Sequence, residues 1–563
     1  MKKFLKVALC SLAAGALYIG SPAPINFLPQ VHAANYQDEL VAAPNVAVVN
    51  TKAGKLQGYI HNGIYTYKGV QYAQAERFMP PQKVDSWSGI KMAITYGKVA
   101  LQLTDEQNDI FPPHWYFPHW EPRNLAQSDN CQNLNIWTPA LDAKKRPVMI
   151  WLHGGGFSAG SASVEDVYNG ENLSRKGDMV VISVNHRLNS MGFLDLSAYG
   201  EKYKSSGNVG MLDIVAALEW VHDNIENFGG DPNNVTVFGQ SGGGAKVLTL
   251  TAMPAAKGLF HKAIVQSGAI EAMGMTLPTQ KNSRRVAEVI LEKLNLSPED
   301  VDKLQTIPYE KFVKVANSSY NQVAKEFGDE MYQGDLGWTP IIDGVNILQN
   351  PVVGGFSAQA DNIPLLIGTV ANEWTTIDLM SKMEKVQNDN KNNWTAAQIE
   401  QKFIEKYGEN SEAIKAAFSE AYPDKPIANA LYIDSWMRTR AIKTANIKSQ
   451  QNAPVYNYIF SWETPIMGGF AMAYHCAEIP FVFNNIELSA EATGATKEAY
   501  ALADKISQTW INFARTGNPN AKGLPNWMPY TRENGATMIF DNKSEMRYRH
   551  DEKLMKLLAP DYL

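Results

Sequence analysis

The stretch NVTVFGQSGGGAKVLTLTAM, residues 234–253, decides how the rest of the chain is interpreted. It joins a short apolar run, rich in β-branched residues, to a helix-capable segment through a glycine-rich turn. Turns of this kind between a strand and a helix serve two unrelated purposes, because they either bind phosphate groups or present a serine nucleophile. The two purposes imply different enzymes, and the spacing around the turn distinguishes them.

A phosphate-binding loop has the spacing G-x-x-x-x-G-K-[ST], since the lysine must reach the outer phosphates and the hydroxyl must hold magnesium. Here Gly239 and Gly244 have the required separation, but Lys246 comes one residue late and Val247 follows it. The alternative pattern G-x-S-x-G is fully met, with Ser241 at its centre. Small neighbours let such a serine occupy a sharp, strained turn. The spacing therefore predicts that Ser241 is a nucleophile.

A serine hydroxyl needs a base to take its proton, and in folds with this turn the chain order is Ser, then Asp or Glu, then His. Only His261, His475 and His550 follow the serine. His261 is excluded because residues 242–260 contain no carboxylate, and His550, in the charged segment RYRHDEK, is expected to face solvent. This elimination leaves His475, which lies in the apolar segment AYHCAEIPFVF.

The acid of such a triad should follow the end of a core strand, where a rigid base can orient the imidazole. Glu373, in LLIGTVANEW, fits this position best. Asp343, in the turn IIDG, and Asp378 remain as alternatives, although an aspartate in such a turn is more typical of a turn former.

Attack on a carbonyl carbon builds negative charge on its oxygen, and binding that charge is usually the largest catalytic contribution. The segment HGGGF, residues 153–157, follows an apolar strand and offers closely spaced backbone N–H groups. We expect Gly155, Gly156 and Gly242 to form the oxyanion hole, with a plain glycine turn as the alternative. His153 is expected to be a structural hydrogen-bonding residue.

Short apolar strands alternate with helical segments from residue 147 onward, as in PVMIWLHGGGF, DMVVISVNHR, KAIVQSG and IPLLIGTV. This alternation predicts an α/β fold with a mostly parallel sheet covered by helices on both faces. Polar helical segments at about 270–335 and 380–450 are expected to be insertions beside the sheet. Within them, Ser297 and Thr395 are predicted to cap helices.

The N-terminus resembles an export signal, because Lys2, Lys3 and Lys6 precede an apolar run that is followed by the small-residue site VHA before Ala34. The apolar run is shorter than the roughly 20 residues of a membrane span, which argues against an anchor. We expect residues 1–33 to be a cleaved signal peptide and residues 34–563 to form a single domain that is secreted or periplasmic. No later segment is predicted to span a membrane.

Charge and cysteine content exclude several classes of function. Without the three leader lysines, 48 basic and 57 acidic residues give a formal charge of −9, so no nucleic-acid partner is expected. Only Cys131 and Cys476 follow the leader, which excludes a disulfide scaffold and a cysteine-based zinc site. A bridge between these two cysteines stays open.

Several of these motifs occur together in one known family. The segment GNVGMLDIVAALEWVHDNIENFGGDPNNVTVFGQSGGG resembles the region that leads into the nucleophile of the type-B carboxylesterases, which have the α/β-hydrolase fold and include the cholinesterases. SDNCQNLNIWTP, HGGGFSAG, VNHRLNSMGFL, LFHKAIVQSG, HCAEIPFVF and FARTGNPN follow the family order, so the resemblance runs from about Val46 to the C-terminus. It implies Ser241 as nucleophile, Glu373 as acid and His475 as base, and it favours Glu373 over Asp343.

The chain also departs from the family pattern. The residues flanking the nucleophile are usually Glu and Ala, where this chain has Gln240 and Gly242. Many members close a loop ahead of the equivalent of Cys131 with a disulfide, whereas GKVALQLTD has no cysteine. That loop continues into IFPPHWYFPHW, residues 110–120, whose rings form either an aromatic lid over the site or a packed substitute for the bridge. Its two histidines, His114 and His119, are a weak indication of a metal site.

The sequence therefore predicts an exported serine hydrolase that cleaves small carboxylic esters in two steps and requires neither a metal nor an organic cofactor. The alternative is a catalytically silent binding or adhesion module of the same fold, which is expected to have lost the serine or the histidine. The sequence does not predict the natural ester or the oligomeric state.

Overall fold

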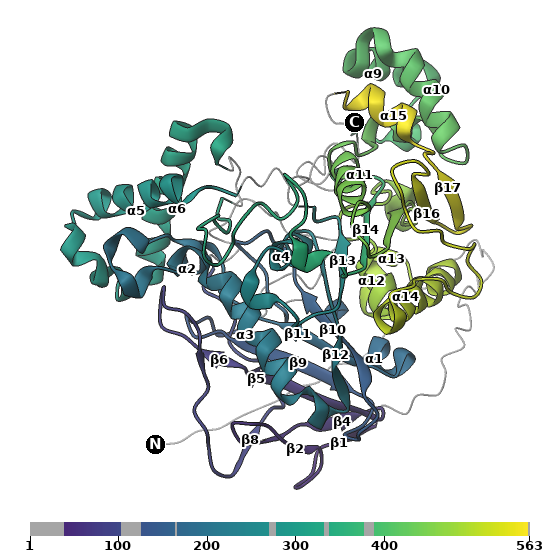
Figure 1. Ribbon diagram of the computed structural model, residues 1–563. Coiled ribbons are helices and arrows are strands. Elements are labelled where there is room, and N and C mark those ends of the chain that lie inside the picture. The colour runs from purple at the N-terminus through teal and green to yellow at the C-terminus, as the bar shows by residue number, and fades with distance from the viewer. Residues whose placement is uncertain are drawn as a thin grey trace, which may run out of the picture.

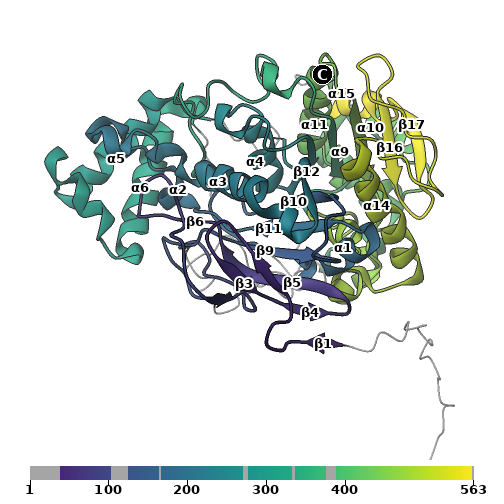
Figure 2. The same cartoon turned by 60° about the horizontal axis from the view of Figure 1, so that its bottom comes forward.

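A computed structural model describes residues 39–102, 125–163, 166–269, 277–331, 337–375 and 388–560 (Figure 1). The predicted signal peptide, the aromatic segment 110–120 and Asp378 lie outside these residues. Twelve of the described strands form one sheet, which Figure 2 shows running from β1 at one edge to β16 and β17 at the other. Their spatial order is β1 (Leu40–Val41), β4 (Tyr59–His61), β5 (Ile64–Gln71), β9 (Asn133–Thr138), β11 (Val180–Val184), β10 (Arg146–Leu152), β12 (Gly230–Gln240), β13 (Lys262–Gln266), β14 (Leu365–Val370), β15 (Val455–Phe460), β16 (Ala536–Phe540) and β17 (Glu545–Tyr548).

The sheet is parallel from β11 through β16 and antiparallel toward both edges. Strands β10, β11, β13, β14, β15 and β16 are buried along their whole length, as expected for parallel strands with helices on both faces. The predicted α/β fold is confirmed. Two small sheets are separate from the large one. The first contains β2 (Val48–Asn50), β3 (Lys55–Gln57) and β8 (Ile90–Met92), and the second contains β6 (Ala73–Gln74) and β7 (Gln82–Lys83).

The sheet separates two hydrophobic cores. Along β10, Val148 and Ile150 face one core and Met149 and Trp151 face the other, because successive side chains of a strand point to opposite faces. The first core is covered by α3 (Val209–Asn224), α4 (Gly242–Leu250) and α11 (Trp436–Lys448), and the second by α1 (Glu171–Gly177), α12 (Ile479–Phe483) and α14 (Lys497–Thr516). This layering leaves the carboxyl ends of the parallel strands free to carry a site.

The two insertions lie at different ends of the molecule (Figure 1). One contains α5 (Gln280–Leu294), a 3₁₀ helix (Pro298–Gln305) and α6 (Tyr309–Phe327), and the other contains α9 (Ala396–Tyr407) and α10 (Ser411–Ala421), near α15 (Glu552–Leu558). The predicted caps are confirmed, because Ser297 forms a capping box with Asp300 and Thr395 forms one with Gln398. The remaining α-helices among the described residues are the short α2 (Asn189–Phe193) and α13 (Ala490–Thr493).

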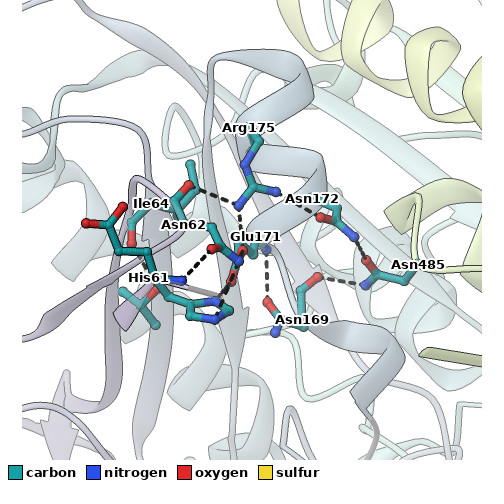
Figure 3. Close-up of polar contacts among 10 residues, drawn as sticks. His61, Asn62, Ile64, Asn169, Glu171, Asn172, Arg175 and Asn485 are labelled. Atoms are coloured by element: carbon teal, nitrogen blue, oxygen red, sulfur yellow. Dashed lines mark hydrogen bonds and ion pairs between the residues drawn. The ribbon is translucent and has the colours of Figure 1, made fainter. Parts of the chain in front are cut away.

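A polar network joins β4, the strand next to the edge strand β1, to helix α1 and to the end of α12 (Figure 3). His61 Nδ1 lies 2.5 Å from Glu171 Oε2, and Arg175 Nη2 donates to Glu171 Oε1. Asn172 Nδ2 then donates to Asn485 Oδ1 at 3.0 Å. The network thereby fixes the far end of α12, the short helix that begins four residues after His475.

His550 contradicts its sequence-based prediction. Its side chain is 1% exposed rather than solvent-facing, and it packs edge-on against Tyr422 at 5.5 Å between ring centroids. The neighbouring Asp551 forms a buried ion pair with Arg438 at 2.6 Å, which draws this charged segment into the protein. Burial lowers the pKa of His550 to about 4. The prediction was wrong because local composition does not reveal a partner more than one hundred residues away.

In the described part of the chain, no helix combines the length and the apolar character that crossing a membrane requires. The same residues contain no cluster of three or more His, Cys, Asp or Glu side chains arranged to hold a metal ion. His114 and His119 fall outside the described residues.

Candidate active site

Ser241 occupies the turn between β12, which ends at Gln240, and α4, which begins at Gly242. Its backbone has φ 56° and ψ −127°, a conformation that L-residues rarely adopt. The strain is held by a hydrogen bond from the N–H of Ser241 to the carbonyl of Gln266 at 2.8 Å. Gly243 has to be glycine, because a Cβ there would lie 1.9 Å from the carbonyl oxygen of Leu152. The predicted strand, sharp turn and helix are thus all present.

Glu373 and His475 are brought together at the carboxyl end of the neighbouring strands. Glu373 lies three residues beyond the end of β14, is fully buried, and places Oε2 2.5 Å from Nδ1 of His475. Its Oε1 accepts the backbone N–H of Val370 at 3.1 Å, and its carbonyl accepts the N–H of His475 at 3.1 Å. The ring of Trp374 stacks on the imidazole, with centroids 5.5 Å apart. The Glu373 side chain is therefore held in place, and Glu373 binds both the side chain and the backbone of His475.

The charge state of His475 reflects two opposing influences. Burial lowers the pKa of its imidazole, whereas charge interactions and hydrogen bonds with Cys476 and Glu373 raise it. The balance holds the pKa of His475 well above its ordinary value. Among the described residues Ser241 Oγ forms no hydrogen bond, and Nε2 of His475 lies 3.2 Å from the side-chain Nε2 of Gln240. The sequence indicated Gln240 only as a departure from the family pattern and did not predict this contact.

The alternative residues considered from the sequence have structural roles. Asp343 Oδ1 accepts three consecutive backbone N–H groups, those of residues 345–347, and its Oδ2 accepts Asn208 Nδ2 at 2.9 Å, which identifies it as a turn former. His261 Nδ1 accepts the N–H of Val235, near the start of the apolar part of β12. His153 is buried, its Nδ1 lies 2.8 Å from the carbonyl of Gly154, and its ring stacks on His186.

The glycine loop after β10 lies against the nucleophile turn. Gly155 and Gly156 have φ 81° and 61°, and the carbonyl of Gly155 accepts the N–H of Ser158 and of Ala159. Within the described residues, the N–H groups of Gly155, Gly156 and Gly242 donate to no backbone or side-chain acceptor. The first residues of a helix also leave their N–H groups unpaired, which applies to Gly242 in α4. These three N–H groups are available to a negatively charged oxygen.

The contact between the loop and the turn depends on a missing side chain. A Cβ on Gly242 would lie 2.1 Å from the carbonyl oxygen of Gly156, a distance that no relaxed structure shows. We therefore expect Gly242→Ala to push the loop away and to lower kcat by about 10²-fold, the usual effect of losing one oxyanion donor. Steady-state kinetics with p-nitrophenyl acetate, together with the thermal unfolding midpoint, measure this. A wild-type kcat in folded Gly242→Ala would contradict the assignment.

Three further titratable side chains are buried around the site. Lys246 Nζ donates to the carbonyl of His153 at 2.9 Å, and burial lowers the pKa of this lysine to about 7. Burial raises the pKa of Glu478 to about 7, and its Oε1 accepts Gln266 Nε2 at 3.1 Å. Asp434 accepts the N–H groups of the first turn of α11, and burial with the nearby charge of Glu373 raises its pKa to about 7. Neither carboxylate was predicted from the sequence, although Glu478 is only three residues from His475.

Cys131 and Cys476 are both buried and neither is in a disulfide in this structure, so the bridge left open by the sequence is not formed. Cys476 has φ 76°, a left-handed conformation in the residue directly after His475. The backbone is therefore constrained on both sides of the base, by this turn and by the bond from His475 N to Glu373.

The sequence and the fold were also compared with those of known proteins. The sequence model described as the carboxylesterase family matches residues 45–557. Para-nitrobenzyl esterase of Bacillus subtilis (strain 168) is 33% identical over 525 residues, covering 91% of this chain and 98% of that protein. Phenmedipham hydrolase of Pseudarthrobacter oxydans is 30% identical, covering 92% and 98%. A solved esterase of Clostridium hathewayi, described as able to hydrolyze aliphatic aromatic polyesters, has a TM-score of 0.83 and 39% identity, covering 93% and 99%.

Proposed function

The chain belongs to the carboxylesterase family and is a carboxylic ester hydrolase, and we propose that Ser241, His475 and Glu373 are the residues that carry out its reaction. The strongest support is the 2.5 Å contact between Glu373 Oε2 and His475 Nδ1, because it leaves Nε2 as the atom of the ring that can take a proton. The strained turn that holds Ser241 adds to this support. A catalytically silent module is not supported, since it has no use for such a pair.

In the proposed first step, Nε2 of His475 takes the hydroxyl proton as Ser241 Oγ bonds to the carbonyl carbon of the ester. The N–H groups of Gly155, Gly156 and Gly242 then bind the oxyanion. When the tetrahedral intermediate collapses, the bond to the alcohol oxygen breaks and His475 gives its proton to that oxygen. Water repeats the sequence on the acyl-enzyme and releases the acid.

Glu373 contributes by charge and by orientation. Its carboxylate accepts the Nδ1 proton, which fixes the tautomer that leaves Nε2 unprotonated. It also stabilises the imidazolium that forms while the tetrahedral intermediate exists. Since Glu373 is fully buried and additionally held by the N–H of Val370, little reorganisation is needed during the reaction.

We further propose that the enzyme prefers esters with an aromatic group. The support is the description of two relatives, a para-nitrobenzyl esterase and an esterase that hydrolyzes aliphatic aromatic polyesters, together with the aromatic sequence of residues 110–120. Aromatic side chains bind an aromatic ring more strongly than an aliphatic ring of similar size. A benzyl ester and a cyclohexylmethyl ester of the same acid form a matched pair that tests this preference.

We expect kcat/KM for the benzyl ester to exceed that for the cyclohexylmethyl ester by about threefold to tenfold, the value of an aromatic contact beyond its buried area. Hydrolysis of both esters can be followed by titration of the released acid. Equal values, or a preference for the cyclohexylmethyl ester, would contradict the aromatic preference while leaving the ester hydrolase assignment intact.

We propose, finally, that residues 1–33 are removed on export and that the mature chain begins near Ala34. The support is the pattern of Lys2, Lys3 and Lys6 before an apolar run and a small-residue cleavage site. N-terminal sequencing of protein secreted by the expressing cell tests this proposal, and a mature chain that retains its leader would contradict it.

A further inference from the structure

The side chain of Gln240 lies at the centre of the site. It is the residue directly before the nucleophile and is 1% exposed. Its amide nitrogen is 3.2 Å from Nε2 of His475, and its amide oxygen lies toward the glycine loop, 3.3 Å from where a Cβ on Gly154 would stand. Because Nδ1 of His475 is occupied by Glu373, Nε2 is the atom that must take the proton of the serine. Gln240 therefore contacts the atom on which the base chemistry depends.

We propose that Gln240 is a positioning residue for His475: in the resting enzyme its amide N–H donates to Nε2 and so holds the ring as the neutral tautomer that acts as a base. This inference rests on the proposed roles of Ser241 and His475. It adds a third side chain that controls the base, besides Glu373 and the stacked ring of Trp374.

The preference for an unprotonated Nε2 follows from donor and acceptor chemistry. An amide NH₂ group only donates, so a ring nitrogen in contact with it must carry a lone pair. The buried carboxylate of Glu373 only accepts, so the proton of the neutral ring belongs on Nδ1. Turning the amide of Gln240 so that its oxygen faced an unprotonated Nε2 would place two acceptors in contact. The contact at 3.2 Å therefore selects the tautomer that is ready to act as a base.

Nε2 has one lone pair, so the Ser241 hydroxyl replaces the amide N–H as its partner when the proton is transferred. Gln240 gives up and gains no proton, since the serine proton moves to Nε2 and then to the departing alcohol. A carboxylate in its place can only accept, and an apolar side chain does neither.

The groups that face His475 explain why such a donor is needed. Glu373 contacts the ring, Cys476 and Glu478 interact electrostatically with it, and Asp434 interacts electrostatically with Glu373. Interactions with Cys476 and with the Glu373 carboxylate favour the imidazolium and hold the pKa of His475 above its ordinary value. An imidazolium cannot act as a base. The N–H of Gln240, together with burial, favours the neutral ring.

The test compares Gln240→Met, which removes both amide functions at similar length, with Gln240→Glu, which keeps only an acceptor. The pH dependence of kcat/KM and of kcat is measured between pH 5 and 9 for a p-nitrophenyl ester. Losing the donor favours the imidazolium, so we expect the acid limb of Gln240→Met to move to higher pH by about half a unit to one unit. For Gln240→Glu we expect a shift of about one unit or more, because a carboxylate then faces the ring. KM should stay within about twofold, since Gln240 acts through His475 and not through substrate binding.

Gln132→Met is the matched control, because Gln132 is equally buried and binds Asp213 away from the triad. Its acid limb should coincide with that of the wild type. Acid limbs of both Gln240 variants at the wild-type position would overturn the inference, and if one variant fails to fold the other still decides. A fluorophosphonate probe separates the two claims: wild-type protein without an adduct contradicts the proposed function, whereas a labelled protein whose Gln240 variants keep the wild-type profile contradicts only this inference.

Discussion

We expect Ser241→Ala to lower kcat for ester hydrolysis by about 10⁴- to 10⁶-fold, the range seen when a triad nucleophile is removed from a hydrolase. The residual rate comes from the oxyanion hole and substrate binding, which the substitution leaves in place. Alanine keeps the Cβ, so the left-handed turn at this position gains no new steric conflict. The measurement is kcat with p-nitrophenyl acetate, accompanied by the thermal unfolding midpoint.

The chain offers a matched control for this prediction in Ser267. This serine also has a positive φ, 46°, is 1% exposed, and lies at the end of β13, the strand next to β12. Its hydroxyl has no hydrogen-bond partner in the described part of the chain. Ser267→Ala should therefore keep a kcat within about twofold of wild type, as is usual for a side chain with no interaction in the transition state. Equal losses in the two variants would mean that the turn, rather than the Ser241 hydroxyl, was disturbed.

We expect Glu373→Gln to lower kcat by about 10³- to 10⁴-fold, because an amide can offer its NH₂ to Nδ1 and so select the wrong tautomer of His475. It also removes the charge that stabilises the imidazolium. The shape of the site is preserved, since Gln keeps the length of Glu and can still accept the N–H of Val370. Stopped-time assays at high enzyme concentration measure the residual rate.

Asp343→Asn is the control for the choice of acid. Asp343 binds backbone N–H groups in its own turn, so its substitution should change stability and leave kcat of the folded protein within about threefold of wild type. The assignment fails if Glu373→Gln retains near-wild-type activity or if Asp343→Asn loses as much activity as Glu373→Gln. Either result would show that another carboxylate orients the base.

Features that depend on neighbours in the sequence could be predicted from it. The turn at Ser241 follows from four glycines within six residues, and the capping boxes at Ser297 and Thr395 each lie within one helical turn. Glu373 could be proposed as the acid because a triad acid should follow a core strand, and the run LLIGTV has the composition of one. In each case the physical cause acts over a few residues.

Features that depend on the fold bringing distant segments together could not be predicted. The contact between Gln240 and His475 spans 235 residues, so the sequence shows only a substituted side chain beside the nucleophile. The burial of His550 depends on the ion pair between Arg438 and Asp551, which no local pattern reveals. The absence of a side chain at Gly242 matters because the carbonyl of Gly156 packs there, a consequence of two turns meeting at the carboxyl end of the sheet.

The most direct test of the central claim is covalent labelling of the folded wild-type protein with a fluorophosphonate probe, followed by peptide mass spectrometry. An activated serine attacks the phosphorus and keeps the adduct, whereas an ordinary hydroxyl is a weak nucleophile at its free pKa. We predict one adduct per chain, on the peptide that contains Ser241, with full labelling of Ser267→Ala and none of Ser241→Ala. A folded wild-type protein without an adduct, or a Ser241→Ala variant labelled as fully as the wild type, would contradict the assignment of Ser241 as the nucleophile.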